Sequence, residues 1–237
     1  MASLPSWLPI LLDRISWGCS TSPWFANLAD DEKIVDAAKE NLTDLWPFIK
    51  DLPTNIGAVR EKAPPHMEAA QNLLQQLADD ERHYQQLFIR QCYLAGLDER
   101  DLVKIVPGET TRVLCEGMKR FCQESSYVDG VHAIVAAEMA ATLYSRAALP
   151  HYDSYFERHP EKYSTEVVED GLEWLRLHAK PHTRHALWMK RMLGDIENKT
   201  GNEIPEGADV ILAALLKLWQ CPTEETKTSS DVPTCVK

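Results

Sequence analysis

One carboxylate stands alone in an apolar stretch of the chain. Between Val131 and Tyr144, Glu138 is the only carboxylate and the only permanently charged side chain, and most of its neighbours are Ala, Val, Ile, Met and Leu. A helix that is apolar nearly all round belongs in the centre of a protein. A carboxylate there must be paired, protonated or bound to a metal, because an isolated buried charge is prohibitively costly. From this residue alone, a salt bridge to an arginine of a neighbouring helix, a neutral glutamic acid and a metal ligand all stay open.

Three histidines share the apolar face of another expected helix. His178, His182 and His185 stand at i, i+4 and i+7 on the apolar stripe of residues 172–193. Three stacked imidazoles repel one another when protonated and each need a partner when neutral, so an ordinary core role explains them poorly. Imidazole is a ligand for Fe, Zn, Cu and Ni. Pro181 removes a backbone hydrogen bond and is expected to kink this helix or to make it restart.

A third group of candidate ligands lies on the long helix expected around residue 80. Gln76, Asp80 and His83 fall within about 60° of one another on a helical wheel, beside an apolar stripe. The spacing of Asp80 and His83, i and i+3, is the one with which helices offer a carboxylate and an imidazole to one metal. The charged side chains next to them are expected to point elsewhere, onto a solvated face: Asp79, Glu81 and Arg82.

The elements that must position these residues are helices. Helical periodicity dominates the chain, and several expected helices are longer than the average globular helix, which favours a bundle around a central cavity. Proline and glycine, among them Pro53 and Pro150, are expected at the junctions. No repeat or long linker divides the chain, so we expect a single helical-bundle domain over 1–220 and a disordered tail over 221–237. The expected helices cover roughly 4–16, 30–50, 66–95, 109–125, 128–147, 164–194 and 206–220.

The composition argues against several classes of protein. The chain has 237 residues, with 25 Lys+Arg, 36 Asp+Glu and a formal net charge of −11, whereas general nucleic-acid binding needs a basic face. Its 44% hydrophobic and 26% charged residues are typical of a soluble globular protein. No apolar run is long enough to span a membrane, and the apolar opening is a poor signal peptide. The six cysteines form no C-x-x-C pair, so we expect reduced thiols and a cytoplasmic protein, with neither nucleic acid nor membrane as a partner.

Taken together, the three motifs resemble those of the haem-oxygenase-like metal oxidases, a family related to the TenA thiaminase and PqqC groups. The family pattern is a carboxylate and a histidine on one long helix, a glutamate in an alanine-rich helix, and His-x3-Asp-x2-His on a later helix. The resemblance covers roughly residues 66–195 and includes neighbouring residues, such as Trp174-Leu-Arg-Leu before His178. It implies the following metal ligands: Asp80, His83, Glu138, His178, His182 and His185.

The chain departs from the family pattern at two positions. Gln76 replaces the glutamate that most members place seven residues before the first histidine. A subgroup of alkene-forming fatty-acid decarboxylases instead uses a carboxylate three residues before that histidine, which Asp80 matches. His182 replaces the aspartate of the last motif. With fewer anions to neutralise two cations, one iron ion and two iron ions both stay open, and Gln76 would be a weak ligand or would support the ligands from outside.

The resemblance implies an all-α, seven-helix haem-oxygenase-like bundle with a central site. It also implies an enzyme that uses Fe(II), as one or two ions, and O2 as co-substrate to oxidise a small molecule, an amino acid or a fatty-acid-like carboxylate. The family reactions are C–C cleavage, decarboxylation, desaturation and N-oxygenation. The candidate cations for a substrate carboxylate are Arg146, Lys180 and Arg184.

Two other classes of function stay open. A metal-independent enzyme of the TenA or PqqC kind would use the histidines as acid and base groups, and turnover after exhaustive chelation would favour it. A binding or scaffolding protein would keep the polar cluster for structure alone, or around a structural metal. Bundles of this kind often form dimers, so a homodimer also stays open.

Overall fold

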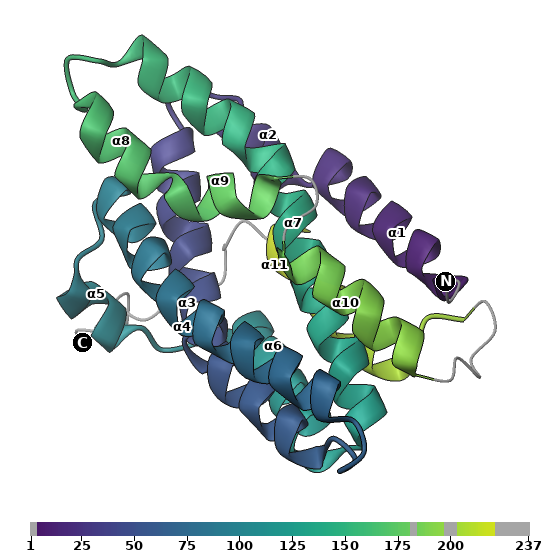
Figure 1. Cartoon of the computed structure of the whole chain (residues 1–237). Coiled ribbons are helices and arrows are strands. Elements are labelled where there is room, and N and C mark those ends of the chain that lie inside the picture. Colours follow the sequence, from purple (N-terminus) through teal and green to yellow (C-terminus); the bar gives the residue numbers. More distant parts are fainter. Residues whose placement is uncertain (1–3, 181–183, 197–202, 221–237) are drawn as a thin grey trace, which may run out of the picture.

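The computed structural model describes residues 4–180, 184–196 and 203–220. In this part of the chain the structure contains eleven α-helices, one π-helical turn and no strand (Figure 1), and the all-α prediction is confirmed. The predicted tail over 221–237 lies outside the described residues. The elements are α1 (Trp7–Thr21), α2 (Pro23–Leu28), α3 (Ile34–Lys62), α4 (Glu68–Leu94), α5 (Glu99–Lys104), α6 (Glu109–Lys119), η1 (Arg120–Glu124), α7 (Tyr127–Arg158), α8 (Thr165–Gly171), α9 (Glu173–Ala179), α10 (Arg184–Asp195) and α11 (Glu206–Gln220).

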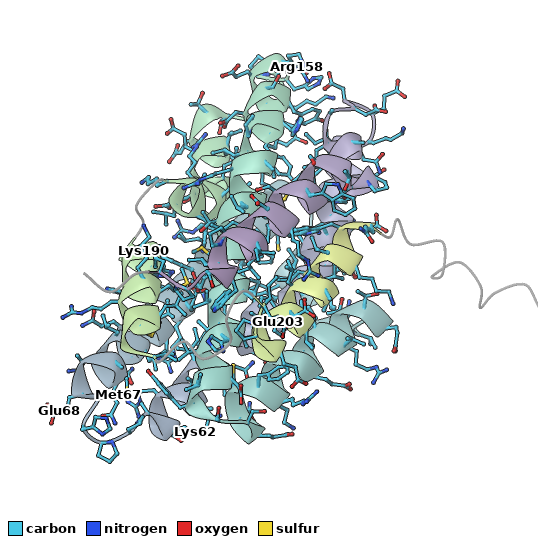
Figure 2. The ribbon with its side chains drawn as sticks, turned by 90° about the vertical axis from the view of Figure 1, so that its right-hand side faces the viewer. Lys62, Met67, Glu68, Arg158, Lys190 and Glu203 are labelled. Carbon is cyan, nitrogen blue, oxygen red and sulfur yellow. The ribbon has the colours of Figure 1, made fainter. Side chains whose placement is uncertain are left out.

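Three long helices, α3, α4 and α7, form the frame of the bundle. α3 packs along α4, while α7 packs against α11 and α9. The short helices α9 and α10 each contact both α4 and α7, so they bridge the two long helices (Figure 1). Figure 2 shows Lys62, Met67 and Glu68, which mark the α3–α4 connection, at one end of the bundle and Arg158 at the other. In the same view Lys190 of α10 lies between these two ends.

α7 is central because its N-terminal half is apolar on every side. All residues over 131–138 are buried, and burying each of the larger aliphatic side chains, Val131, Ile134 and Val135, contributes roughly 1.5–3 kcal/mol. The helix begins at a capping residue, Ser126, whose hydroxyl accepts a hydrogen bond from the Asp129 amide. Glu138 is thus carried into the core by a stretch of α7 that is buried at every position.

The predicted helix ends at Pro53 and Pro150 are wrong. α3 continues through Pro47 and Pro53, and α7 continues through Pro150. A proline inside a helix leaves the carbonyl four residues earlier without its backbone donor. For Pro53 this carbonyl is that of Ile49, and the side-chain amide of Gln85 on α4 donates to it at 3.0 Å. A neighbouring helix therefore supplies the hydrogen bond that Pro53 removes.

The helix predicted over 164–194 is three helices. α8 ends at Gly171, α9 ends at Ala179, and α10 begins at Arg184. These interruptions, together with the short helices α2 and α5, turn the seven expected helices into eleven. No helix within the described ranges has both the length and the apolar character to cross a bilayer.

Candidate metal centre

Four buried side chains from four helices meet at one point in the bundle. Glu81 of α4, Glu138 of α7, His178 of α9 and His185 of α10 each offer one ligand atom, and these atoms all lie within 4.8 Å of one another. Helical bundles build their metal sites in this way, from carboxylates and imidazoles on facing helices. We call these four residues the carboxylate–histidine cluster.

The break between α9 and α10 brings the two histidines of the cluster together. Lys180 is extended, with φ −61° and ψ 134°, because a residue that precedes a proline avoids the helical region. In one straight helix, residues seven apart are separated by roughly 10 Å along the axis. The ring centroids of His178 and His185 lie only 6.4 Å apart. The interruption of the helix between Ala179 and Arg184 thus shortens the distance between two potential ligands.

His185 lies among three carboxylates. Its Nδ1 is 3.0 Å from Oε2 of Glu138 and 3.5 Å from Oε1 of Glu81, and its Nε2 is 3.3 Å from Oδ2 of Asp80. Burial alone would lower the pKa of this imidazole, but the negative charge of Glu138, helped by the other two carboxylates, raises the pKa to about 9. Burial likewise raises the pKa of Glu138, and the charge of His185 more than reverses this, so the pKa ends below its usual value. Without a metal, these two residues form a buried ion pair.

Glu81 is held in the opposite protonation state. Burial, followed by the negative charge of Glu138, raises its pKa well above the usual value. Without a cation, this shift favours the protonated form of the carboxyl group. Its Oε1 atom is buried and accepts no hydrogen bond, a condition that costs a buried polar atom roughly 1–3 kcal/mol.

His178 is prepared to act as a neutral ligand. Burial lowers the pKa of its imidazole, and its Nδ1–H donates a hydrogen bond of 2.9 Å to the Trp174 carbonyl oxygen. Because that oxygen can only accept, the lone pair must be on Nε2. The ring of Trp174 lies against the imidazole, with the centroids 4.2 Å apart. Nε2 is the nitrogen that His178 can offer to a metal.

The donor set of the cluster fits a divalent cation. Two carboxylates would balance its two charges, and two neutral imidazoles would complete the set without adding charge. The orphaned Oε1 atom of Glu81 would gain a partner. Mixed imidazole and carboxylate donors suit Fe and other first-row divalent metals. The site can thus exchange protons on Glu81 and His185 for a cation.

The structure brings together only part of the predicted ligand set. Glu138, His178 and His185 converge in the cluster, and Asp80 lies beside His185 but outside the group of four. The predicted inward orientation is wrong for His83 and for Gln76, which are exposed. His182 lies outside the described residues.

Glu81 is the residue that the sequence analysis misses. Its expected place on a solvated face is wrong, since Glu81 is only 3% exposed. The face of α4 that faces the core contains Leu74, Leu77, Ala78 and Phe88, and Glu81 is i+7 from the first and i−7 from the last. The apolar stripe expected from the sequence consists of Leu73, Leu77 and Tyr84. Of these, Leu77 is buried, whereas Leu73 and Tyr84 are only half-buried. The sequence signal for Glu81 was its place on the helical face of Leu74, Leu77, Ala78 and Phe88, which is the more apolar face of α4.

Arg146, a candidate for holding a substrate carboxylate, has a structural task in the described fold. Its guanidinium donates to the carbonyl oxygens of Ala179 at 3.0 Å and Lys180 at 3.4 Å. These are carbonyls that the end of α9 leaves without helical donors. Arg146 therefore stabilises the break that places His178, while Lys180 is exposed.

Known structures show the same fold. The chain resembles a TenA homologue from Pseudomonas syringae pv. tomato, with 15% identity, 92% of this chain and 89% of that chain covered, and a TM-score of 0.67. A domain of unknown function with a haem-oxygenase-like fold from Shewanella denitrificans gives 15% identity, coverage of 89% and 85%, and a TM-score of 0.68. A TenA homologue from P. horikoshii gives 14% identity, coverage of 90% and 96%, and a TM-score of 0.54.

At these identities the likeness establishes the fold alone. No protein-family profile matches the chain, and a search of curated protein sequences also gives no match. The fold and the site define a haem-oxygenase-like helical protein with a buried carboxylate–histidine cluster that could bind a metal.

Proposed function

We propose that this protein is a non-haem iron-dependent oxidase or oxygenase that uses O2 to oxidise a small molecule, an amino acid or a fatty-acid-like carboxylate. The observation that carries the proposal is the convergence of Glu81, Glu138, His178 and His185 from four helices on one buried point. Bound there, Fe(II) would supply the redox chemistry with O2 that amino-acid side chains lack. The four residues of the cluster would hold the ion.

The surroundings of the cluster suit chemistry that must exclude water. The ring of Tyr84 lies 5.4 Å from that of His178 and 5.3 Å from that of His185, between centroids. The ring of Trp188 stacks on His185 with its centroid at 5.4 Å, and the ring of Trp174 lies 4.2 Å from that of His178. An apolar enclosure of this kind strengthens electrostatic interactions and limits side reactions with water. It also favours a substrate with an apolar portion.

The test begins with the metal. The chain should be purified without oxygen in the presence of Fe(II), and the iron content per chain measured together with O2 consumption on adding candidate amino acids and medium-chain fatty acids. We expect bound iron in the parent chain and its loss in Glu138→Ala and His178→Ala. Asp79→Asn is a matched control, because Asp79 is exposed and pairs with Arg82. Absence of iron, or iron content unaffected by the two cluster variants, would defeat the proposal.

The metal-independent alternative rests on a different observation. Glu138 and His185 form an ion pair without any cation, and His178 stays neutral beside them, so the cluster holds both an acid and a base. This reading predicts that turnover survives exhaustive chelation and is unaffected by added Fe(II). Loss of turnover on chelation, restored by Fe(II), decides for the oxidase.

A further inference from the structure

Asp80 meets the carboxylate–histidine cluster from the far side of one imidazole. Its Oδ2 atom lies 3.3 Å from Nε2 of His185, whereas Nδ1 of the same ring faces Glu138 at 3.0 Å and Glu81 at 3.5 Å. A neutral imidazole has one N–H group and one lone pair, on different nitrogens. The two ring nitrogens of a metal-binding His185 must therefore take different roles.

We propose that Asp80 is a positioning residue that accepts the Nε2–H of His185 and thereby keeps the Nδ1 lone pair directed at the metal. The inference rests on the proposed function, because it concerns how the cluster binds its cation. A carboxylate that accepts the outer N–H of a ligating histidine fixes the tautomer and the ring orientation, and it makes the imidazole a stronger donor.

The arrangement of the carboxylates decides which nitrogen binds the metal. Glu81 and Glu138 both lie on the Nδ1 side of His185, and both belong to the group whose ligand atoms are within 4.8 Å of one another. Asp80 is outside that group. Its side chain is also 19% exposed, against 4% for those of Glu81 and Glu138. The two deeply buried carboxylates share a cation with Nδ1, and the more exposed one orients the ring.

The two histidines then bind through opposite nitrogens. In His178, Nδ1–H donates to the Trp174 carbonyl oxygen and Nε2 is left for the metal. In His185, Nε2–H donates to Asp80 and Nδ1 is left for the metal. Each outer N–H group thus has its own acceptor, one a backbone carbonyl and the other a side chain that can be changed by mutation.

The first measurement is the affinity of the full-length chain for Co(II), compared among the parent, Asp80→Ala, Asp80→Asn and Asp79→Asn. We expect Asp80→Ala to weaken binding about 10- to 100-fold. Asp80→Asn should recover much of this loss, because its amide oxygen still accepts the N–H of His185. Asp79→Asn should bind as the parent does, since Asp79 is exposed and pairs with Arg82. A loss in Asp80→Asn as large as in Glu138→Gln, with a similar change in the Co(II) absorption bands, would make Asp80 a direct ligand and overturn the inference.

The second measurement reads the tautomer without any activity. Ligating histidines in Co(II) proteins give shifted proton NMR signals from their outer N–H groups, and we expect two in the parent chain. Asp80→Ala should lose the His185 signal through faster exchange with water and keep the His178 signal. Retention of both signals in Asp80→Ala, with parent affinity, would overturn the inference while leaving the proposed metal site intact. A parent chain that binds neither Co(II) nor Fe(II) would overturn both.

Discussion

Glu81 and Glu138 are buried in the same cluster, yet their carboxyl groups differ in charge. Glu138 is ionised because its charge is paired with protonated His185. For Glu81, burial and the neighbouring charge of Glu138 both oppose a second anion and favour the protonated carboxyl group. In the metal-free protein, the charges of the four cluster residues therefore cancel. This cancellation lets four polar groups share the core without a cation.

The difference in charge predicts that two similar substitutions change the stability of the metal-free protein by unequal amounts. Glu81→Gln replaces a neutral group by a neutral group, so the free energy of unfolding should change by less than about 1 kcal/mol. Glu138→Gln removes the nearest of the three carboxylates around the buried positive charge of His185 and should cost about 1.5–3 kcal/mol. Both variants should lose metal affinity. Urea unfolding of the metal-free proteins at pH 7 measures the contrast, and equal losses of stability would contradict the assigned protonation states.

The same protonation states make metal affinity depend on pH. A cation must displace the proton of Glu81 and that of His185, whose pKa is raised to about 9. The apparent affinity should therefore rise with pH, by up to about two decades per pH unit while both protons are displaced, and level off above the pKa of His185. Titration with Co(II) at pH 6, 7 and 8 measures the slope, and a flat profile would show that neither group is protonated.

Metal affinity should rise with pH, but the stability of the metal-free protein should fall with pH because the pKa of His185 is raised. The folded state binds this proton more tightly than the unfolded state does, so the resulting stabilisation is fully present below the ordinary histidine pKa of 6.5. It is lost as the pH rises through about 9. Alkaline conditions should thus weaken the metal-free fold while they strengthen metal binding.

At the scale of elements, α3 is a long helix that depends on its neighbour. The proline at position 53 leaves the Ile49 carbonyl without a backbone donor, and Gln85 of α4 supplies one. The same amide donates to the Lys50 carbonyl at 2.8 Å. Gln85 thus supplies the hydrogen bond that Pro53 removes from α3 and also connects α3 to α4, the helix that carries Glu81.

Removing that side-chain amide should destabilise the protein through α3. Gln85→Leu should lower the free energy of unfolding by about 1–2 kcal/mol, because the freed carbonyl loses its donor. The cost should shrink in a Pro53→Ala background, where the backbone N–H of residue 53 can donate to Ile49 again. Gln86→Leu is the control, since Gln86 is exposed. Chemical unfolding measures the loss of free energy of unfolding in each background. Equal losses for Gln85→Leu in both would show that its hydrogen bond does not compensate for Pro53.

At the scale of the whole molecule, α11 packs closely against α7 at Gly207. A Cβ atom at Gly207 would lie 2.6 Å from the backbone carbonyl oxygen of Asp129. Backbone cannot give way as a flexible side chain does, so any larger residue would push α11 away from α7. Those helices share a large packed surface in the core, and α7 carries Glu138.

Two alanine substitutions should consequently have opposite signs. Gly207→Ala should destabilise the fold by about 1–3 kcal/mol through overpacking. Gly57→Ala in α3 has no atom within 4 Å of the added Cβ and should stabilise by about 0.5–1 kcal/mol, because alanine is the better helix former. Thermal unfolding of both variants beside the parent provides the comparison. A neutral or stabilising Gly207→Ala would contradict the close approach of α11 to α7.

Much of the fold is determined by local patterns in the sequence. Apolar residues at helical spacing predict an all-α chain, and Glu138 in an apolar helix predicts a polar group in the core. The proline after Lys180 predicts the break between α9 and α10, since its steric effect acts on the residue directly before it. These inferences succeed because each depends on neighbours in sequence.

Tertiary structure alone decides which polar residues of α4 face the core and which prolines end a helix. Asp80, Glu81 and His83 lie close together in sequence, and a rotation of α4 by one residue changes which of them is buried. That rotation is set by packing against α3, α8, α9 and α10, and all of these except α3 lie far away in the chain. Likewise, Pro53 is tolerated because Gln85 reaches it from another helix. Local propensity cannot encode a partner that only the packed bundle supplies.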